Sequence, residues 1–277
     1  MFRRTVKQSD RDPDVLVDSK LADTGYVDMF GLEWQTFDGF IGKEVMSHGH
    51  LFGRFLLPKD FFSGKAVVDI GCGNGRIGRL IAPLSDSYLG VDLSESVFSF
   101  PKYTRRPGTF SLLRASATDL PLEDSCADVT VCWGVLHHVD KPDVAFSELV
   151  RITRPGGSIL LYVYPEAMDV RMNLNAFMRG LPLNRSKPIL DQLSDGLDEW
   201  REVDAFYANI LASNVALSFK HSRPWQKFQW FDGVTPRYHW SLEKRIEKLA
   251  EQFDSRVTTY RPGCFLIQPP EKASYRK

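Results

Sequence analysis

The chain has 277 residues, enough for one large α/β domain or for a domain with a sizeable insertion. Its 43% hydrophobic and 25% charged residues are typical of a globular protein with ample core-forming side chains. Lys and Arg together number 35, as do Asp and Glu, so the formal net charge is zero. A balanced charge gives no broad attraction to nucleic acid or to an anionic membrane, and we expect neither as a partner.

The four cysteines show neither the spacing of a disulfide framework nor that of a CxxC metal site. The N-terminal residues are charged and lack the apolar segment of a signal peptide. The longest apolar run, residues 159–164, is far too short to span a bilayer. We therefore expect a reduced, cytoplasmic protein.

Two different segments precede the main domain. Residues 1–24 are charged and contain Pro13, so we expect a flexible arm. Residues 25–62 are rich in aromatic side chains and are interrupted by several glycines. This second segment has two compatible interpretations, as helices packed on the main domain or as a lid over a ligand pocket.

From residue 63 the sequence alternates between short β-rich runs and helical lengths. We expect strands at 66–70, 87–91, 109–114, 128–132 and 158–163, and helices at 76–82, 94–103 and 142–151. Short, continuously apolar strands separated by helices indicate a buried parallel sheet with right-handed crossovers.

The alternation stops after Tyr164. Residues 168–240 contain a helical stripe of apolar side chains and then a loop rich in proline and aromatics, which predicts a helical insertion that covers an acceptor pocket. A last helix at 241–253 precedes two short β-like runs around Pro262 and Gly263. We therefore expect an α/β, Rossmann-like, doubly wound core formed by residues 63–167 and 241–270. Its seven-stranded sheet is mostly parallel and ends in an antiparallel closing hairpin.

The strongest motif is VVDIGCGNGR at residues 67–76, where a short apolar run ends in Asp69. Gly71, Gly73 and Gly75 then follow at alternate positions before helix-forming sequence begins. Glycine tolerates positive φ angles and lets bare backbone approach a ligand closely. The motif therefore predicts the floor of a cofactor site.

The class of cofactor needs further signals, because GNGRIG at residues 73–78 also satisfies the GxGxxG pattern of nicotinamide cofactors. Asp69 immediately precedes the turn, where a carboxylate would face a negatively charged pyrophosphate. An acid at this place suits a ligand that carries a positive ammonium or sulfonium group. An NAD(P)-dependent oxidoreductase stays open as the alternative.

The order and spacing of several motifs resemble class I S-adenosylmethionine-dependent methyltransferases of the type 11-like, small-molecule kind. The motifs are VVDIGCGNG at 67–75, GVDLS at 90–94, ATDLP at 117–121, WGVLHHV at 133–139, and ELVR at 148–151 with RPGG at 154–157. The resemblance is strong over residues 65–164 and holds only in general layout for the last hundred residues. It implies methyl transfer from S-adenosylmethionine, with S-adenosylhomocysteine as the product.

The resemblance also implies roles for individual residues at the cofactor. Gly71 and Gly73 would lie against the methionine part, with Asp69 contributing charge or ordering a water, and the carbonyl of Trp133 would meet the methionine amine. Gly75 is a further cofactor-binding candidate of the same loop. The carboxylate of Asp92, followed by Leu93, would accept the ribose hydroxyls, although a dinucleotide site predicts an acid there too. Thr118 and Asp119 would face the adenine, whose amine Asp119 could bind; the alternative for Asp119 is a turn cap before Pro121.

Candidate catalytic residues follow the fourth strand of the core. His137 and His138 lie at the carboxyl edge of the sheet, where one could act as a general base for a hydroxyl acceptor. The alternative is that they cap or pack the loop. His48 and His50 resemble a metal pair in spacing only, and we expect no metal.

The acceptor is approached by elimination. After the fourth strand the sequence has no Asn- or Asp-Pro-Pro-aromatic motif, the sequence associated with methylation of nucleobase or glutamine amides. It has no Pro-Cys dipeptide, so a covalent cytosine-C5 mechanism has no visible nucleophile. The layout of the aromatic N-terminal segment and the helical insertion is similar to that of small-molecule methyltransferases, which implies a small biosynthetic acceptor, a sugar or secondary metabolite. We expect O-methylation in preference to N-methylation. Tyr26, Trp34, Tyr238 and His239 are candidates for the acceptor pocket. Alternatives are a binding module without catalysis and a protein or RNA methyltransferase.

Overall fold

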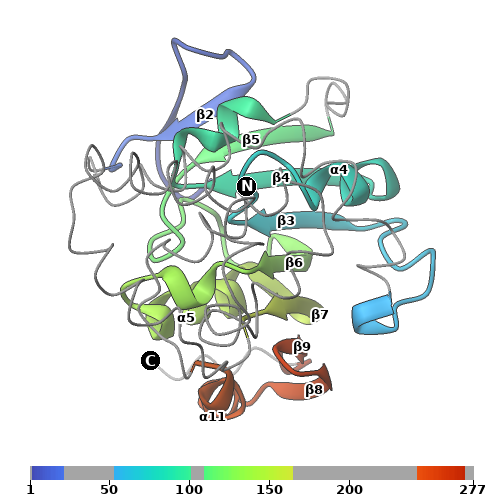
Figure 1. Cartoon of the computed structure of the whole chain (residues 1–277). Helices are drawn as coiled ribbons and strands as arrows, with labels where there is room; N and C mark the ends of the chain where they lie inside the picture. Colours follow the sequence, from blue (N-terminus) through green and yellow to red (C-terminus); the bar gives the residue numbers. More distant parts are fainter. Residues whose placement is uncertain (1, 22–52, 101–108, 165–241, 272–277) are drawn as a thin grey trace, which may run out of the picture.

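A computed structural model of the protein describes residues 2–21, 53–100, 109–164 and 242–271 (Figure 1). These residues contain a nine-stranded sheet with the order β1-β2-β5-β4-β3-β6-β7-β9-β8. The chain enters the centre of the sheet at β3, runs outward through β4 and β5, and then returns to build the other half from β6. This reversal makes the sheet doubly wound.

The core of the sheet has the predicted composition. Its parallel strands are β3 (Ala66–Ile70), β4 (Ser87–Asp92), β5 (Phe110–Arg114), β6 (Ala127–Trp133) and β7 (Thr153–Tyr162). The hairpin of β8 (Arg256–Arg261) and β9 (Cys264–Gln268) closes the sheet antiparallel to β7. The prediction of a Rossmann-like, mostly parallel sheet with an antiparallel closing hairpin is confirmed.

Both faces of the sheet are buried, which explains the continuous apolar runs in the sequence. On β6, Val129, Val131 and Trp133 pack into one core cluster, which also contains Phe55 and Phe62. The opposite face packs against α5 (Pro142–Ile152) and α11 (Ile246–Glu251), whose apolar side chains form the second cluster.

The remaining helical elements are short. They are α4 (Gly78–Ile81), η2 (Ala82–Leu84), η3 (Glu95–Ser99), η5 (Leu136–His138) and η6 (Leu242–Arg245). Ser94 begins η3 as predicted, because its hydroxyl accepts a hydrogen bond from the Ser96 N–H at 3.3 Å. The helix predicted at 94–103 is shorter than expected, because η3 ends at Ser99 and the backbone of Phe100 is already extended.

The prediction of a flexible arm at residues 1–24 was wrong for the described part of that segment. β1 (Val6–Gln8) and β2 (Val15–Asp18) form a hairpin, and β2 pairs in parallel with β5. The hairpin is ordered because Val15 is fully buried and because charged side chains of this segment have partners. Arg4, for example, forms an ion pair with Asp18. These two strands extend the predicted seven-stranded sheet to nine.

Several sequence-based expectations fall outside the described residues. These are most of the proposed lid at 25–62, the proposed insertion at 168–240, and the candidates Tyr26, Trp34, His48, His50, Tyr238 and His239. Within 53–62, Phe55 and Phe62 are fully buried against the sheet, as the packing interpretation predicts. Where helices are described, none is long and apolar enough to cross a membrane.

Candidate functional site

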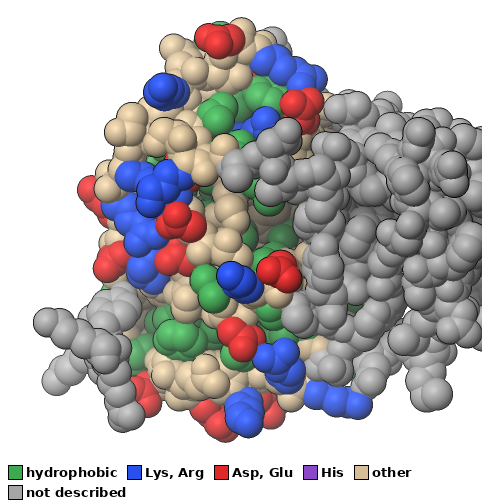
Figure 2. Space-filling view, turned by 90° about the vertical axis from the view of Figure 1, so that its left-hand side faces the viewer, with side chains coloured by type: hydrophobic (Ala, Val, Ile, Leu, Met, Phe, Trp, Pro, Cys, Tyr) green, Lys and Arg blue, Asp and Glu red, His purple; other side chains and the backbone are tan. Residues whose placement is uncertain are grey.

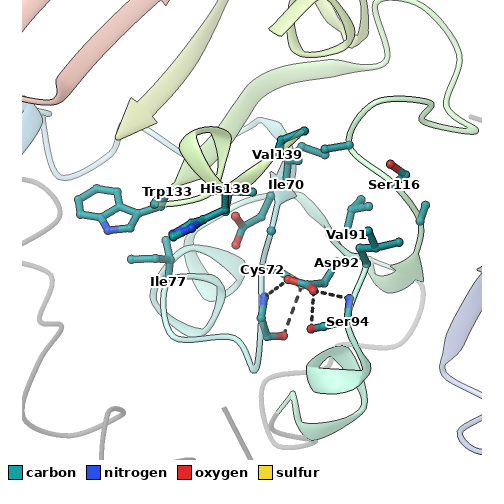
Figure 3. Close-up of a pocket in the computed structure, with 18 of the residues that line it drawn as sticks. Ile70, Cys72, Ile77, Val91, Asp92, Ser94, Ser116, Trp133, His138 and Val139 are labelled. Carbon is teal, nitrogen blue, oxygen red and sulfur yellow. Dashed lines mark hydrogen bonds between the residues drawn. The ribbon is translucent and has the colours of Figure 1, made fainter. Parts of the chain in front are cut away.

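A cavity of about 300 Å³ opens at the carboxyl ends of β3, β4 and β6 (Figure 3). This is the position where the strand order reverses, and ligands of open α/β sheets bind there. The walls come from the segments that follow β3, β4, β5 and β6, with Tyr164 after β7. Of the candidates drawn from the sequence, the walls include Asp69, Gly71, Gly73, Asp92, Leu93, Thr118, Trp133 and His138.

The glycine loop that follows β3 forms the floor of the pocket. Gly71 has a φ of 75°, and a Cβ added to it would lie 2.1 Å from Cγ2 of Val135. The backbone N–H groups of Gly71 and Cys72 both bind the carbonyl of Val91, at 2.7 and 3.0 Å. The loop is therefore fixed against the end of β4, and only glycine fits at residue 71.

Asp69 lies at the base of the pocket and is 1% exposed. The hydroxyl of Tyr88 on β4 donates a hydrogen bond of 2.7 Å to its Oδ2. Burial raises the pKa of Asp69 to about 7, opposed by the Tyr88 hydrogen bond and increased by the nearby charge of Asp92. A cationic ligand beside Asp69 would favour its ionised form.

Asp92 joins the glycine loop to the end of β4. Its Oδ2 accepts the Gly73 N–H at 2.7 Å, and its Oδ1 accepts the N–H and hydroxyl of Ser94 at 2.8 and 2.7 Å (Figure 3). Burial raises the pKa of Asp92, and these hydrogen bonds act against that rise. A carboxylate offers about four lone-pair sites, so capacity remains for a ligand hydroxyl.

The wall after β6 separates the two neighbouring histidines. Figure 3 shows His138 and Trp133 on one side of the pocket, away from Asp92 and Ser94. His137 is buried outside the lining; its Nδ1 accepts the Tyr164 N–H at 3.4 Å, and its ring lies 4.4 Å from the Tyr164 ring. The packing interpretation therefore fits His137, and His138 is the histidine that faces the pocket.

The charged residues of the lining are mostly acidic. Asp69, Asp92 and Asp140 are accompanied by Arg76 among the described lining residues. A wall with this excess of negative charge suits a ligand with cationic groups better than a pyrophosphate. In the part of the chain that the structure describes, no group of His, Cys, Asp and Glu could hold a metal ion.

Comparison with known proteins agrees with this geometry. Residues 68–161 match the family model described as a methyltransferase domain. A methyltransferase of Mycobacterium bovis, described as uncharacterized, is 35% identical over 100 residues, which are 35% of this chain and 39% of that protein. A mouse tRNA (carboxymethyluridine(34)-5-O)-methyltransferase is 30% identical over 122 residues, which are 43% of this chain and 17% of that protein. The chain thus spans about two fifths of the length of the Mycobacterium bovis relative.

Residues 68–161 are thus similar in sequence to methyltransferase domains. Among solved structures, an S-adenosylmethionine-dependent methyltransferase from Mesorhizobium loti is 24% identical with a TM-score of 0.38, covering 43% of this chain and 54% of its own. The resemblance of its motifs implies S-adenosylmethionine as the cofactor of this domain.

The residues of the methyltransferase domain fit this cofactor. Gly71 and Gly73 present bare backbone to the cavity, and Gly71 is required there because a Cβ at this residue would collide with Val135. Asp92 would hold the ribose hydroxyls, and Asp69 would lie near the positive charges of the methionine part. The cavity size falls at the lower end of the usual range for small-molecule sites.

Two of the expected cofactor residues lie elsewhere in the methyltransferase domain. Gly75 is outside the lining, and a Cβ at this position would lie 2.7 Å from the Phe100 ring, so it serves packing. Asp119 is also outside the lining, and its carboxylate accepts hydrogen bonds from Arg3 at 3.1 Å and Arg4 at 2.6 Å. The expected adenine contact of Asp119 does not match this position, because the N-terminal hairpin binds its carboxylate.

Sequence reasoning missed several contributors to the pocket, among them Tyr164 and Ser116. Tyr164 lines it from the end of β7, and its only sequence signal is its place directly after a predicted strand. Ser116 lines it from the loop after β5, where its hydroxyl is 2.9 Å from that of Thr118. Neither residue belongs to a motif that would single it out.

Proposed function

We propose that the protein transfers the methyl group of S-adenosylmethionine to a small molecule of biosynthesis, with a hydroxyl oxygen favoured over nitrogen as the acceptor. The observation that carries this proposal is the composition of the pocket. A glycine floor, two acids at the ends of β3 and β4, and a histidine after β6 all face one cavity.

The bound cofactor supplies an electrophilic methyl group on a sulfonium. The task of the protein is then to align the acceptor and to exclude water from the reacting atoms. Trp133, His138 and Tyr164 form the wall on the side of β6 and β7, away from the residues after β5. We assign the acceptor to this aromatic side.

His138 is our candidate for the general base. A hydroxyl acceptor must lose a proton, and the imidazole of His138 faces the pocket where that proton would be released. An amine acceptor would need this base less. His137 provides a matched control, because it is a buried histidine one residue away that does not line the pocket.

Calorimetry with S-adenosylmethionine, S-adenosylhomocysteine, NAD and NADP tests the choice of cofactor. We expect heat with the two sulfur compounds and none with the nicotinamide cofactors. A response to NAD or NADP alone would overturn the proposal in favour of an oxidoreductase. Binding of S-adenosylhomocysteine without turnover of any acceptor would favour the binding module without catalysis.

Activity against a panel of small hydroxyl and amine acceptors tests the rest, with S-adenosylhomocysteine release as the readout. We expect the H138A variant to lower kcat for a hydroxyl acceptor by about a hundredfold to ten-thousandfold, the usual contribution of a general base. The H137A variant should keep a kcat closer to that of the wild type. Methylation of tRNA or protein in place of small molecules would contradict the acceptor class.

A further inference from the structure

The loop that follows β5 forms one wall of the cofactor pocket, on the side away from β6. Ala115, Ser116, Ala117 and Thr118 contribute to the lining. A hydrogen bond of 3.3 Å from the Asp119 N–H to the Ser116 carbonyl closes a turn in this loop. The shape of the wall therefore depends on where Asp119 is held.

Asp119 is held by the N-terminal hairpin, which we define as β1, β2 and the residues that precede β1. Nη1 of Arg4 lies 2.6 Å from Oδ1 of Asp119, and Nη2 of Arg4 donates to the Asp119 carbonyl. Nε of Arg4 donates to Oδ1 of Asp18 at 3.0 Å. One guanidinium thus connects the end of β2 to the loop.

Arg3 adds a second set of contacts to the same loop. Its Nε donates to the Leu120 carbonyl at 2.9 Å, and its backbone N–H donates to the Pro121 carbonyl at 2.9 Å. Phe2 forms a bridge with Leu122 one step further along. The first residues of the chain therefore run beside the loop and bind its backbone.

The ion pair between Arg4 and Asp18 is well shielded from solvent. The Arg4 side chain is 14% exposed and the Asp18 side chain 3%. Burial acts to raise the pKa of Asp18, but hydrogen bonds from Arg4 and from the Lys20 N–H lower it overall. The hydrogen bond to Asp18 raises the pKa of Arg4, so both groups carry their charges at neutral pH. Removal of one partner would leave a shielded charge uncompensated.

The sheet fixes the position of the hairpin relative to the loop. Val15 and Val17 of β2 pair with Leu112 and Arg114 of β5, so Asp18 comes level with the first residue of the loop. On the other side, Glu148 of α5 accepts the Leu120 N–H at 2.8 Å, and Arg151 donates to the Leu122 carbonyl at 2.7 Å. Hydrogen bonds from the hairpin on one side and from α5 on the other therefore hold the loop.

Charges of both signs are interleaved on the surface of the molecule. On the face that Figure 2 shows, the coloured Lys and Arg side chains lie next to Asp and Glu side chains. The basic residues beside the loop are likewise paired, Arg4 with Asp18 and Asp119, and Arg151 with Glu148 and Asp124. This pairing indicates that the basic residues hold the loop in position, and it argues against a phosphate-binding surface at this place.

We propose that Arg4, acting through Asp119, is a positioning residue for the cofactor, and that the N-terminal hairpin preorganises the pocket wall after β5. This inference rests on the proposed function, because it takes S-adenosylmethionine as the ligand of this wall. A wall held in its binding conformation reduces the ordering that must accompany binding. Asp119 then supports affinity through the position of the loop.

Calorimetry with S-adenosylhomocysteine on the full chain tests the inference with the R4A, D119N and R4A/D119N variants. R11A is the matched control, because Arg11 lies in the turn between β1 and β2 but forms an exposed ion pair with Glu95 away from the loop. We expect R4A and D119N each to weaken binding by about threefold to thirtyfold, in line with coupling between contacting residues. The affinity of the double variant should be no lower than that of the single variant that binds more weakly. R11A should bind like the wild type, and the affinity of R4K should lie between those of the wild type and R4A.

Hydrogen exchange separates positioning from a general loss of stability. In R4A, backbone amides of the 115–122 loop should exchange faster while those of β3 and β6 keep wild-type rates. D119N is a second guard, because the Asp119 side chain is 48% exposed and its replacement should leave the fold intact.

The outcomes distinguish the two proposals. Weak binding in D119N with wild-type binding in R4A would overturn the inference and restore a direct adenine contact for Asp119. Wild-type binding in both variants would overturn the inference and leave the proposed function standing. If the wild-type chain itself failed to bind S-adenosylhomocysteine, the proposed function would fall and the inference with it.

Discussion

The two ends of the cofactor pocket are held in different ways. At the floor, the glycine loop is shaped by its own backbone, with a positive φ at Gly71 and hydrogen bonds to the carbonyl of Val91 on the neighbouring strand. At the wall after β5, the loop is shaped by side chains from remote parts of the chain, Arg4 on one side and Glu148 on the other. The floor is fixed by the next strand along the chain, whereas the wall depends on Glu148, 28 positions from Leu120, and on Arg4, 115 positions from Asp119.

The difference has an energetic consequence. A backbone that only glycine can adopt leaves no alternative conformation for a substituted residue, so a change at the floor acts directly on the ligand surface. The wall after β5 has several partners, and loss of one contact leaves the others in place. We therefore expect the largest effects on ligand binding from substitutions at the floor and intermediate effects where the floor meets β4. Titration of a single group should have the smallest effect.

The G71A variant should show the largest effect. The substitution combines a left-handed backbone with a Cβ placed 2.1 Å from Val135, a strain and overpacking cost of roughly 2–5 kcal/mol. We expect S-adenosylhomocysteine binding to be lost in calorimetry and the free energy of unfolding in urea to fall.

G64A is the control for this variant. Gly64 has a φ of 70°, similar to that of Gly71, but a Cβ there would have no atom within 4 Å. It therefore carries the backbone strain without the collision, and it should destabilise the fold by about 1–2 kcal/mol while leaving binding unchanged. Equal loss of binding in both variants would show that the collision at Val135 is irrelevant.

The D92A variant tests the joint between the floor and β4. It removes the acceptor for the Gly73 N–H and for Ser94, together with the carboxylate assigned to the ribose hydroxyls. We expect binding of S-adenosylhomocysteine to weaken by roughly 1–3 kcal/mol in calorimetry, the range for stranded hydrogen-bonding groups.

D86A is the matched control for D92A, because Asp86 also accepts a loop N–H, that of Gly64 at 3.1 Å, but lies outside the pocket. It should bind the ligand like the wild type. Wild-type affinity in D92A itself would remove the assignment of Asp92 to the ribose.

The same contrast explains what the sequence predicts well. Local signals predict the central strands, and the boundaries of β3 are those expected. The floor of the pocket was predictable because Asp69, Gly71 and Gly73 owe their geometry to neighbours in the sequence and to the adjacent strand. Asp92 was predictable for the same reason, since a strand ends there.

Long-range contacts account for what the sequence did not predict. The hairpin at the N-terminus resembled a solvated arm because the partners of its charges, Asp119 among them, lie far along the chain. Asp119 matched a family motif, yet the direction of its side chain depends on Arg3 and Arg4. His137 and His138 are equivalent in sequence, and only the turn after β6 decides that His138 faces the pocket.

The pH dependence of stability and of binding tests the titration of Asp69, for which we expect the smallest effect. The folded protein holds the proton of Asp69 up to a pKa of about 7, whereas the unfolded chain releases it near 3.8. Between these values the folded state binds more protons, so this group makes the free energy of unfolding fall as pH rises from about 4 to about 7, after which its effect is constant. Urea unfolding of the unliganded wild type and of D69N over this range should show a steeper fall in the wild type, because Asp92, whose pKa burial also raises, still contributes in D69N.

Binding should respond to pH with the opposite sign. A ligand with a sulfonium and an ammonium favours ionised Asp69, so the affinity for S-adenosylmethionine should rise with pH through about 7, by at most about tenfold for each pH unit. S-adenosylhomocysteine lacks the sulfonium charge and should show a smaller rise. This carboxylate interacts electrostatically with other polar or titratable groups, namely Tyr88, Asp92, Cys72, Cys132 and Arg76. D69N therefore decides the origin: a profile that keeps its slope in D69N would assign the titration to one of those neighbours, and a flat wild-type profile would mean that the floor carries no titrating charge toward the cofactor.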